Sequence, residues 1–428
     1  MKQAYIKGVG NTPFGRLEGR NTLDLMAQAA NAALKSAGLV RAEVDGVLCG
    51  YATTLPHLML ANLFCERFSL RPHYAHGMAA GGATGAAMLM LARELVQSGR
   101  CRTVLVVAGE NRLSGQTRDS SIQTLAQVGH ADFEVPNGAS VPAYYGLMAS
   151  RYMHEAGVTN EDLAEFAVLM RNNARRHPDS HLTQEITVAD VLASKPIAEP
   201  LRLMDCCPIS DGAMALIVSS EPGAGVRVKM VGAGQAHFHQ HLTALQDVMN
   251  TGAGAAAKIA FREAGLTTSD IDYLGVYDSF TITLLMLLEE IGFAARGQAA
   301  QRVRQGDFSQ GGVLPLNTHG GLLSFGHCGV AVAGQVGQHG IGDALFAQGK
   351  QVDVLGATGF FGSKRQLFLL RQGVDAGGFA RVGAPHKGDF RHADGRQVVQ
   401  LGGGGQKTGG VHPAHGGDGG WGQGGGRA

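Results

Sequence analysis

The sequence has no apolar run as long as the roughly 18 residues that a membrane-spanning helix requires. Its first thirty residues also lack a cationic segment followed by an apolar one, so we expect neither a membrane span nor a secretory leader. An excess of one charge sign is missing too, because 36 Lys and Arg stand against 35 Asp and Glu, for a net charge of +1. These absences predict a cytoplasmic protein without the electrostatic signature of a nucleic-acid or membrane-surface binder.

Cysteine is scarce, and its spacing suits neither a metal site nor a disulfide framework. The six cysteines include no Cys-x-x-Cys pair. We therefore expect reduced thiols and no bound metal.

Composition divides the chain into a folded part and a tail. Apolar residues make up 44% and charged residues 17%, which is ordinary for a globular protein, and 428 residues exceed one average domain. From about residue 372, however, the sequence becomes rich in glycine, with runs such as LGGGGQKTGG, and holds the chain's single Trp. Residues 372–428 are predicted to be disordered, because they cannot bury enough apolar surface to offset the entropy of ordering.

The folded part contains an internal repeat. AALKSAGLVRAEVDGVLCGY at 32–51 aligns without a gap with IAFREAGLTTSDIDYLGVYD at 259–278. Each copy predicts a helix, a stop at Gly38 or Gly265 as the C-cap, a short acidic turn and an apolar strand. The chain is therefore predicted to contain a duplicated α/β unit.

A second repeated element places small residues on a helix. GGATGAAMLMLARELVQSGRCRTVLVVAGE at 81–110 and a looser copy at 326–362 each predict a Gly-rich turn, a helix of small residues and an apolar strand. Helices with so little side-chain volume can be buried on all sides between two sheets. We predict an α/β protein of two halves, 1–222 and 223–371, in layers, with the mainly helical residues 111–205 inserted over the central cleft.

Three further stretches carry a resemblance to a known family: IAEPLRLMDCCPISDGAMALIVSS at 197–220, VYDSF at 276–280 and NTHGGLLSFGHCG at 317–329. Together with the duplication they resemble the thiolase superfamily, in its sterol-carrier-protein and lipid-transfer-protein branch. The resemblance implies a five-layer α-β-α-β-α thiolase fold, usually dimeric, that acts on acyl-CoA thioesters. Coenzyme A would then enter as part of the substrate, with no separate cofactor.

The family's two catalytic cysteines have no counterpart at the matching positions. The nucleophile position falls on Gly82 in GGATGAA, and the second cysteine position falls on Ala357 in GATGFFG. Glycine and alanine cannot form an acyl-enzyme, and the nearby Thr84 hydroxyl has no evident base. Gly359, the glycine of the second motif, joins the predicted substrate and oxyanion region.

Two polar family positions remain occupied. Tyr277 stands in the oxyanion motif, with Asp278 and Ser279 beside it, and His327 stands in the family's Gly-His-Pro motif, where Cys328 replaces the proline. A phenol and an imidazole can move a proton at an alkoxide and stabilise an enolate. We predict Tyr277 and His327 as the catalytic pair, with Asp278 and Ser279 in the substrate and oxyanion region.

The remaining candidates have a structural explanation beside the functional one. His319 and Thr84 complete the predicted substrate and oxyanion region, although His319 alternatively holds the turn that follows it. Cys328 is predicted to pack, because neighbours in sequence such as His327 and Cys328 generally point apart. The basic stretch ARRH at 174–177 would meet the 3′-phosphate of coenzyme A or end a solvated helix, and the second explanation is favoured.

The predicted function is cleavage or formation of a carbon–carbon bond on a CoA thioester without an acyl-enzyme, as in retro-aldol cleavage of a β-hydroxyacyl-CoA. The resemblance to steroid side-chain aldolases implies a homodimer and a small partner that bears an OB fold and a zinc ribbon. Two alternatives stay open. One is a non-catalytic subunit that binds acyl-CoA or lipid, and the other is an acetyl-CoA acetyltransferase-type enzyme that uses Cys328 or another group as a replacement nucleophile.

Overall fold

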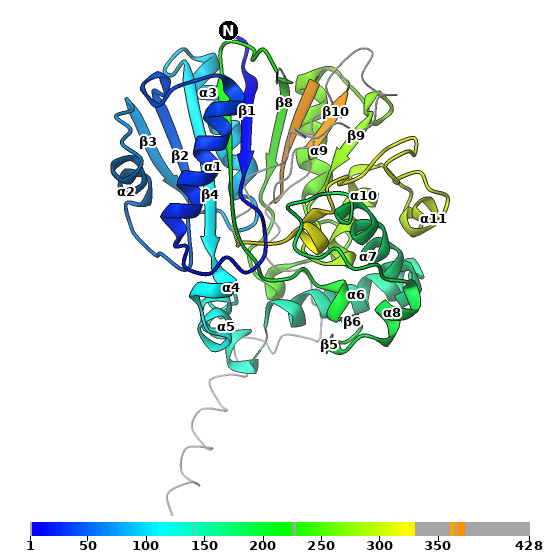
Figure 1. The fold of residues 1–428 in the computed structure, drawn as a ribbon. Helices are drawn as coiled ribbons and strands as arrows, with labels where there is room; N and C mark the ends of the chain where they lie inside the picture. Colours follow the sequence, from blue (N-terminus) through cyan, green and yellow to red (C-terminus); the bar gives the residue numbers. More distant parts are fainter. Residues whose placement is uncertain (1, 139, 226–227, 330–359, 364–365, 373–428) are drawn as a thin grey trace, which may run out of the picture. The chain divides into compact units, whose positions relative to one another are not determined.

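Nine strands form one mixed sheet in the computed structural model, which describes residues 2–138, 140–225, 228–329, 360–363 and 366–372. The N-terminal half of the sheet contains, in spatial order, β3 (Tyr74–Met78), β2 (Gly46–Gly50), β4 (Thr103–Asn111), β7 (Asp211–Ser219) and β1 (Tyr5–Asn11). The C-terminal half continues with β8 (Val228–Ala236), β11 (Gln366–Gln372), β10 (Phe360–Ser363) and β9 (Tyr273–Gly275) (Figure 1).

The predicted repeat forms an equivalent helix on each half. Helix α1 (Thr22–Ala37) packs on β1, β4 and β7, and α9 (Ala253–Ala264) packs on β8 and β11. Gly38 and Gly265 end these helices in the left-handed region, with φ angles of 67° and 69°, where glycine is favoured because it has no Cβ. Both predicted C-caps are confirmed.

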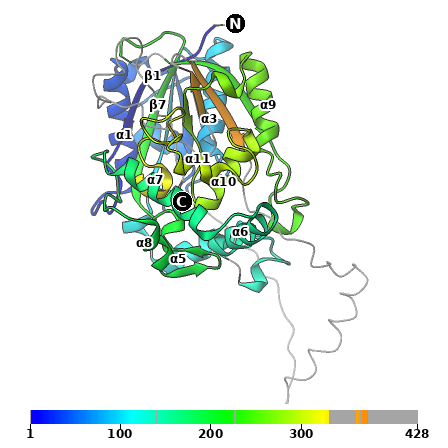
Figure 2. The ribbon, with the colours of Figure 1, turned by 90° about the vertical axis from the view of Figure 1, so that its right-hand side faces the viewer.

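The small-residue helix is central. Helix α3 (Thr84–Gln97) contacts β2, β4 and β7 of the N-terminal half and also β11 of the C-terminal half. Figure 2 shows α1 and α9 on opposite sides, with the strands of the two halves and α3 between them. The α-β-α-β-α layer order is thus confirmed. The second small-residue helix, predicted after residue 329, lies outside the described residues.

The two halves are hydrogen-bonded to each other, whereas the sequence predicts two separate sheets. Tyr5 pairs with Lys229 and Ile6 with Val228, where β1 and β8 begin. On its other side β1 pairs with β7 from Tyr5 to Asn11. The start of each strand therefore joins the halves at one end of the molecule.

Most of the remaining helices belong to the insertion between β4 and β7, whereas α2 (Leu60–Arg67) packs on β2 and β3. Residues 111–205 contain α4 (Arg112–Gly115), α5 (Arg118–Ala126), α6 (Val141–Ala156), α7 (Asn160–Ala174), α8 (Val188–Ala193) and the small β5 (Pro196–Ala198) and β6 (Leu201–Arg202) pair. The other helices are α10 (Thr281–Ile291) and α11 (Ala299–Arg304). Buried side chains of α6, α7 and α10 form one hydrophobic cluster. Within the described segments, every helix is too short or too polar to traverse a lipid bilayer.

Candidate active site

A short segment that leads into β7 holds the two predicted catalytic loops next to each other. We call residues 206–210 the bridging segment. The Cys207 N–H donates to the Ser279 carbonyl at 3.0 Å, and the Ser210 N–H donates to the His327 carbonyl at 2.9 Å. The Tyr-Asp-Ser-Phe loop and the loop that carries His327 therefore share one backbone partner, although some fifty residues separate them in the sequence.

Asn317 fixes the backbone just before Tyr277. The Val276 N–H donates to Asn317 Oδ1 at 2.8 Å, and Asn317 Nδ2 donates to the Val276 carbonyl at 2.7 Å. Asn317 has a φ of 42°, a conformation that asparagine tolerates better than most residues. One side-chain amide thus acts as a strand partner beyond the end of β9 and sets the position from which Tyr277 projects.

Tyr277 lies between β9 and α10 and is buried, with 8% of its surface exposed. It belongs to the same hydrophobic cluster as Phe280 and Leu316. The Phe280 ring stacks on Tyr145 of α6, with ring centroids 4.2 Å apart. Residues of the insertion therefore pack against the loop that carries Tyr277, and proton transfer by its phenol stays a prediction.

Asp278 is fully buried and holds a turn. Its Oδ1 accepts from the Leu322 N–H at 2.7 Å, at the start of a single π-helical turn, Gly321–Phe325. A Cβ on Gly321 would lie 1.8 Å from Asp278 Oδ2, so this turn requires glycine. Burial raises the pKa of Asp278 to about 7, while the backbone donors act in the opposite direction. The carboxyl group that we placed in the substrate region is thus engaged by the protein itself.

His327 presents one ring nitrogen to its own loop. Its Nδ1 accepts from the Gly329 N–H at 2.9 Å, and its backbone N–H donates to Ser210 Oγ at 3.2 Å. Desolvation first, and then the nearby Arg112 guanidinium, lower the pKa of His327 to about 3. The ring is therefore neutral at physiological pH. Because Nδ1 accepts, Nε2 carries the proton and is the nitrogen that can donate to a ligand.

Cys328 packs as expected. It is buried in a cluster with Phe325 and with Ala86 and Met88 of α3. Burial, and then the charge of Glu110, raise the pKa of its thiol to about 12. A thiol in this state is a poor nucleophile at physiological pH.

The Gly-rich turn before α3 offers no activated nucleophile in the described structure. Gly82 lies in this turn and has no side chain. The Thr84 hydroxyl donates to the Gly81 carbonyl at 2.7 Å and accepts from the Ala80 N–H at 3.0 Å. Thr84 therefore closes the turn at the start of α3. The two other predicted positions, Ala357 and Gly359, lie outside the described residues.

His319 and Ser279 are the remaining predicted site residues among those that the structure describes. His319 is buried, its Nε2 accepts from the Gly321 N–H at 2.9 Å, and its ring meets Phe325 edge-on at a centroid distance of 5.5 Å. These contacts hold the turn, as the structural explanation predicts. His319 Nδ1 is buried without a hydrogen-bond partner in the described part of the chain, and so is the Ser279 hydroxyl. The Ser279 hydroxyl remains a candidate contact for a ligand.

Glu110 and Arg112 at the end of β4 are site residues that the sequence analysis missed. Glu110 is fully buried, and its Oε2 accepts from the N–H groups of Thr53 and Thr54 at 2.6 and 2.9 Å. A Cβ on Gly329 would lie 1.8 Å from Glu110 Oε1 and 2.9 Å from Arg112 Cδ. The His327 loop therefore rests on both side chains. The signal was present in AGENR, where two opposite charges follow an apolar strand directly.

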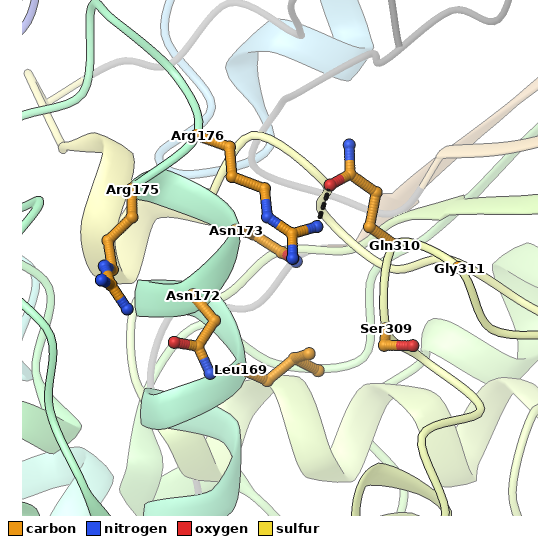
Figure 3. A pocket seen from close by; sticks show the side chains of 8 residues that line it. All are labelled: Leu169, Asn172, Asn173, Arg175, Arg176, Ser309, Gln310 and Gly311. Atoms are coloured by element: carbon orange, nitrogen blue, oxygen red, sulfur yellow. Dashed lines mark hydrogen bonds between the residues drawn. The ribbon is translucent and has the colours of Figure 1, made fainter. Parts of the chain in front are cut away.

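Arg175 and Arg176 line a polar cavity of about 540 Å³ at the end of α7 (Figure 3). Figure 3 shows Arg176 reaching across it to hydrogen-bond Gln310. Arg175 and Arg176 are exposed at the end of α7, as the favoured solvated helix end predicts, and Arg176 also contacts the neighbouring loop. Asn173, also on this wall, donates to the Leu316 carbonyl at 2.9 Å.

Among the described residues, no group of three or more His, Cys, Asp or Glu is placed to share a metal ion.

Comparison with known proteins identifies the family. Two family models match the chain, "Thiolase, N-terminal domain" over residues 4–222 and "Thiolase C-terminal domain-like" over residues 234–337. A steroid side-chain-cleaving aldolase of Thermomonospora curvata is 33% identical over 345 residues, which cover 75% of this chain and 85% of that protein. An acetyl-CoA acetyltransferase of Methanocaldococcus jannaschii is 32% identical over 356 residues, which cover 79% and 89% of the two chains.

The solved structures agree with this result. The Ltp2-ChsH2(DUF35) aldolase superposes with a TM-score of 0.67 and 31% identity over 76% of this chain and 86% of that chain. The layered fold, the duplicated halves and the two family matches show that the chain belongs to the thiolase family. The resemblance to its sterol-carrier-protein and lipid-transfer-protein branch, inferred from the sequence, is confirmed.

Proposed function

We propose that this protein cleaves, or in the reverse direction forms, a carbon–carbon bond of a β-hydroxyacyl-CoA by retro-aldol chemistry. One observation carries the proposal: in the described part of the cleft the family's nucleophile has no replacement. Gly82 lacks a side chain, the Thr84 hydroxyl is bonded to the Gly81 carbonyl, and the Cys328 thiol is buried with a raised pKa. Acyl transfer through an acyl-enzyme needs such a group, whereas an aldol cleavage does not.

The reaction balances without a covalent intermediate. The β-hydroxyl proton passes to a base, the bond between Cα and Cβ breaks, and its electron pair enters the thioester as an enolate. The β-carbon becomes a carbonyl, and a proton then adds to Cα to give the shorter acyl-CoA. We assign proton transfer at the hydroxyl to Tyr277 and hydrogen bonding to the thioester oxygen to His327 Nε2–H.

The similarity to an aldolase that is named for two components, Ltp2 and ChsH2, supports a partner subunit. We propose that this chain forms a homodimer and acts with a small protein that bears an OB fold and a zinc ribbon. Such a subunit would contribute to the binding of acyl-CoA. Co-expression of the two chains, followed by size-exclusion chromatography with light scattering, tests both the partner and the dimer.

Substitution of Tyr277 tests the proposed chemistry. The complex is incubated with β-hydroxyacyl-CoA candidates, and the released acyl-CoA and carbonyl product are measured by mass spectrometry. We expect Tyr277→Phe to lower turnover by about a hundredfold, because it removes the proton-transferring oxygen and little volume. Tyr273→Phe removes the same atom from another buried tyrosine, on β9, and serves as the matched control.

Three results would contradict this assignment. Turnover of Tyr277→Phe near that of the control would remove Tyr277 from the chemistry. A covalent acyl adduct that is lost in Cys328→Ala would favour acyl transfer, the activity named in the acetyltransferase relative. Unchanged acyl-CoA affinity in a Tyr277→Phe, His327→Ala double variant, without turnover by any form of the complex, would favour a binding subunit.

A further inference from the structure

Arg112 is a buried cation with an unused donor. It directly follows β4, and only 7% of its surface is exposed. Its Nε is buried and has no hydrogen-bond partner in the described part of the chain. A buried guanidinium is costly unless its donors are satisfied, and a negatively charged or strongly polarised ligand would satisfy this one.

The position of Arg112 relates it to the predicted chemistry. Its side chain lies against Gly329, and the Gly329 N–H is the group that donates to His327 Nδ1. The charge of Arg112 also interacts with two thiols of these loops. One is Cys207, in the bridging segment, and the other is Cys328, next to His327. The guanidinium therefore lies among the loops that form the candidate active site.

We propose that Arg112 is a further catalytic residue whose guanidinium binds the thioester oxygen as this oxygen acquires the negative charge of the enolate. The inference rests on the proposed function and deepens it. His327 is neutral and supplies a hydrogen bond without charge. Arg112 supplies the permanent positive charge, and its effect is large because the site is shielded from water.

A purely structural ion pair with Glu110 does not account for these observations. Glu110 attracts Arg112 electrostatically, but its Oε2 is occupied by Thr53 and Thr54, and its Oε1 has no hydrogen-bond partner in the described segments. Oppositely charged groups that serve only stability normally bond directly when they are buried, because direct bonds offset their desolvation. Here Arg112 Nε keeps an unused donor, while Glu110 moderates the cost of burying the cation.

Exchange of α-protons tests the inference without knowledge of the natural substrate. The full chain, with its partner if one co-purifies, is incubated in D₂O with acetyl-CoA and with propionyl-CoA, and deuterium at Cα is measured by mass spectrometry. Exchange requires formation of the enolate and no aldol cleavage. We expect Arg112→Met to lower the maximal exchange rate by about a hundredfold and Arg112→Lys by about tenfold, with little change in the acyl-CoA concentration at half-maximal rate.

Arg93→Met is the control for loss of a buried arginine, because Arg93 lies on α3 and forms an ion pair with Glu263. It should exchange at the wild-type rate. Thermal unfolding of each variant identifies misfolding. If Arg112→Met does not fold, the exchange rate of Arg112→Lys is compared with that of wild type. Exchange by Arg112→Lys or Arg112→Met within threefold of wild type, or no exchange by wild type, would overturn the inference. Cleavage of a β-hydroxyacyl-CoA is scored separately, so that the proposed function can survive this failure.

Discussion

At the scale of single residues, burial decides the protonation states of His327 and Cys328. It holds His327 neutral and Cys328 protonated, because a charged imidazolium or thiolate would lose its hydration. Arg112 keeps its charge because guanidinium is too basic to lose its proton in a protein. The site thus combines a neutral hydrogen-bond donor with a permanent cation, a combination suited to an enolate rather than to an attacking thiolate.

The lowered pKa of His327 predicts a dependence of stability on pH. The unfolded ring takes up a proton below about pH 6.5 and the folded ring does not, so the unfolded state binds more protons between that pH and about 3. The contribution of His327 to the unfolding free energy is fully present above about pH 6.5 and is lost as the pH falls. From pH 7.5 to 5.5, we expect the unfolding free energy of wild type, relative to His327→Gln, to fall by about 1 kcal/mol.

Urea unfolding at the two pH values measures this difference. Subtraction of the variant cancels the titration of Asp278, whose raised pKa acts in the opposite direction. The exposed His57→Gln is the control and should change nothing relative to wild type. An unfolding free-energy difference that is the same at both pH values would show that the folded ring titrates normally.

At the scale of elements, the π-helical turn Gly321–Phe325 connects the two catalytic loops. Asp278 accepts hydrogen bonds from the N–H groups at its start, and Gly321 approaches this carboxylate so closely that no side chain fits between them. The turn leads directly to His327. Its shape therefore sets the distance between the Tyr277 loop and the His327 loop.

Gly321→Ala should destabilise the protein by about 3 kcal/mol. Its φ is 61°, which costs an alanine about 1 kcal/mol, and the new methyl group would displace the Asp278 carboxylate from its backbone donors. Gly38→Ala meets the same φ strain in open space and should cost about 1 kcal/mol. Gly311 has neither a positive φ nor a close neighbour, so Gly311→Ala should change the unfolding free energy by no more than about 0.5 kcal/mol. Denaturant unfolding ranks the three, and equal effects of Gly321→Ala and Gly38→Ala would exclude the Asp278 contact as the cause.

At the scale of the whole molecule, the duplication places one helix outside each half and α3 between them. The central helix tolerates strands on both sides because Gly85, Ala86 and Ala87 at its start occupy little space and are buried. Pairing of β1 with β8 then joins the halves at one end. The carboxyl ends of β4 and β9 carry Arg112 and Tyr277 toward the same set of loops.

The Gly-rich composition after residue 372 predicts that the tail is dispensable for folding. A chain that ends at Gln372 should unfold within about 2 °C of the full-length protein and retain its α-proton exchange, because the composition of the tail provides too little apolar surface to stabilise the domain. Calorimetry and the exchange assay check this expectation. A clearly lower transition temperature of the shortened chain would show that the tail packs on the folded part.

The sequence by itself determined the duplicated α/β architecture, the Gly38 and Gly265 helix ends and the family. These features depend on local conformational preference and periodic burial, which neighbouring residues encode. Only the tertiary structure showed that Asp278 and His319 hold a turn and that Arg112 enters the site. Those contacts join β4, the bridging segment and two loops far apart in the sequence, and their formation depends on how the layers pack.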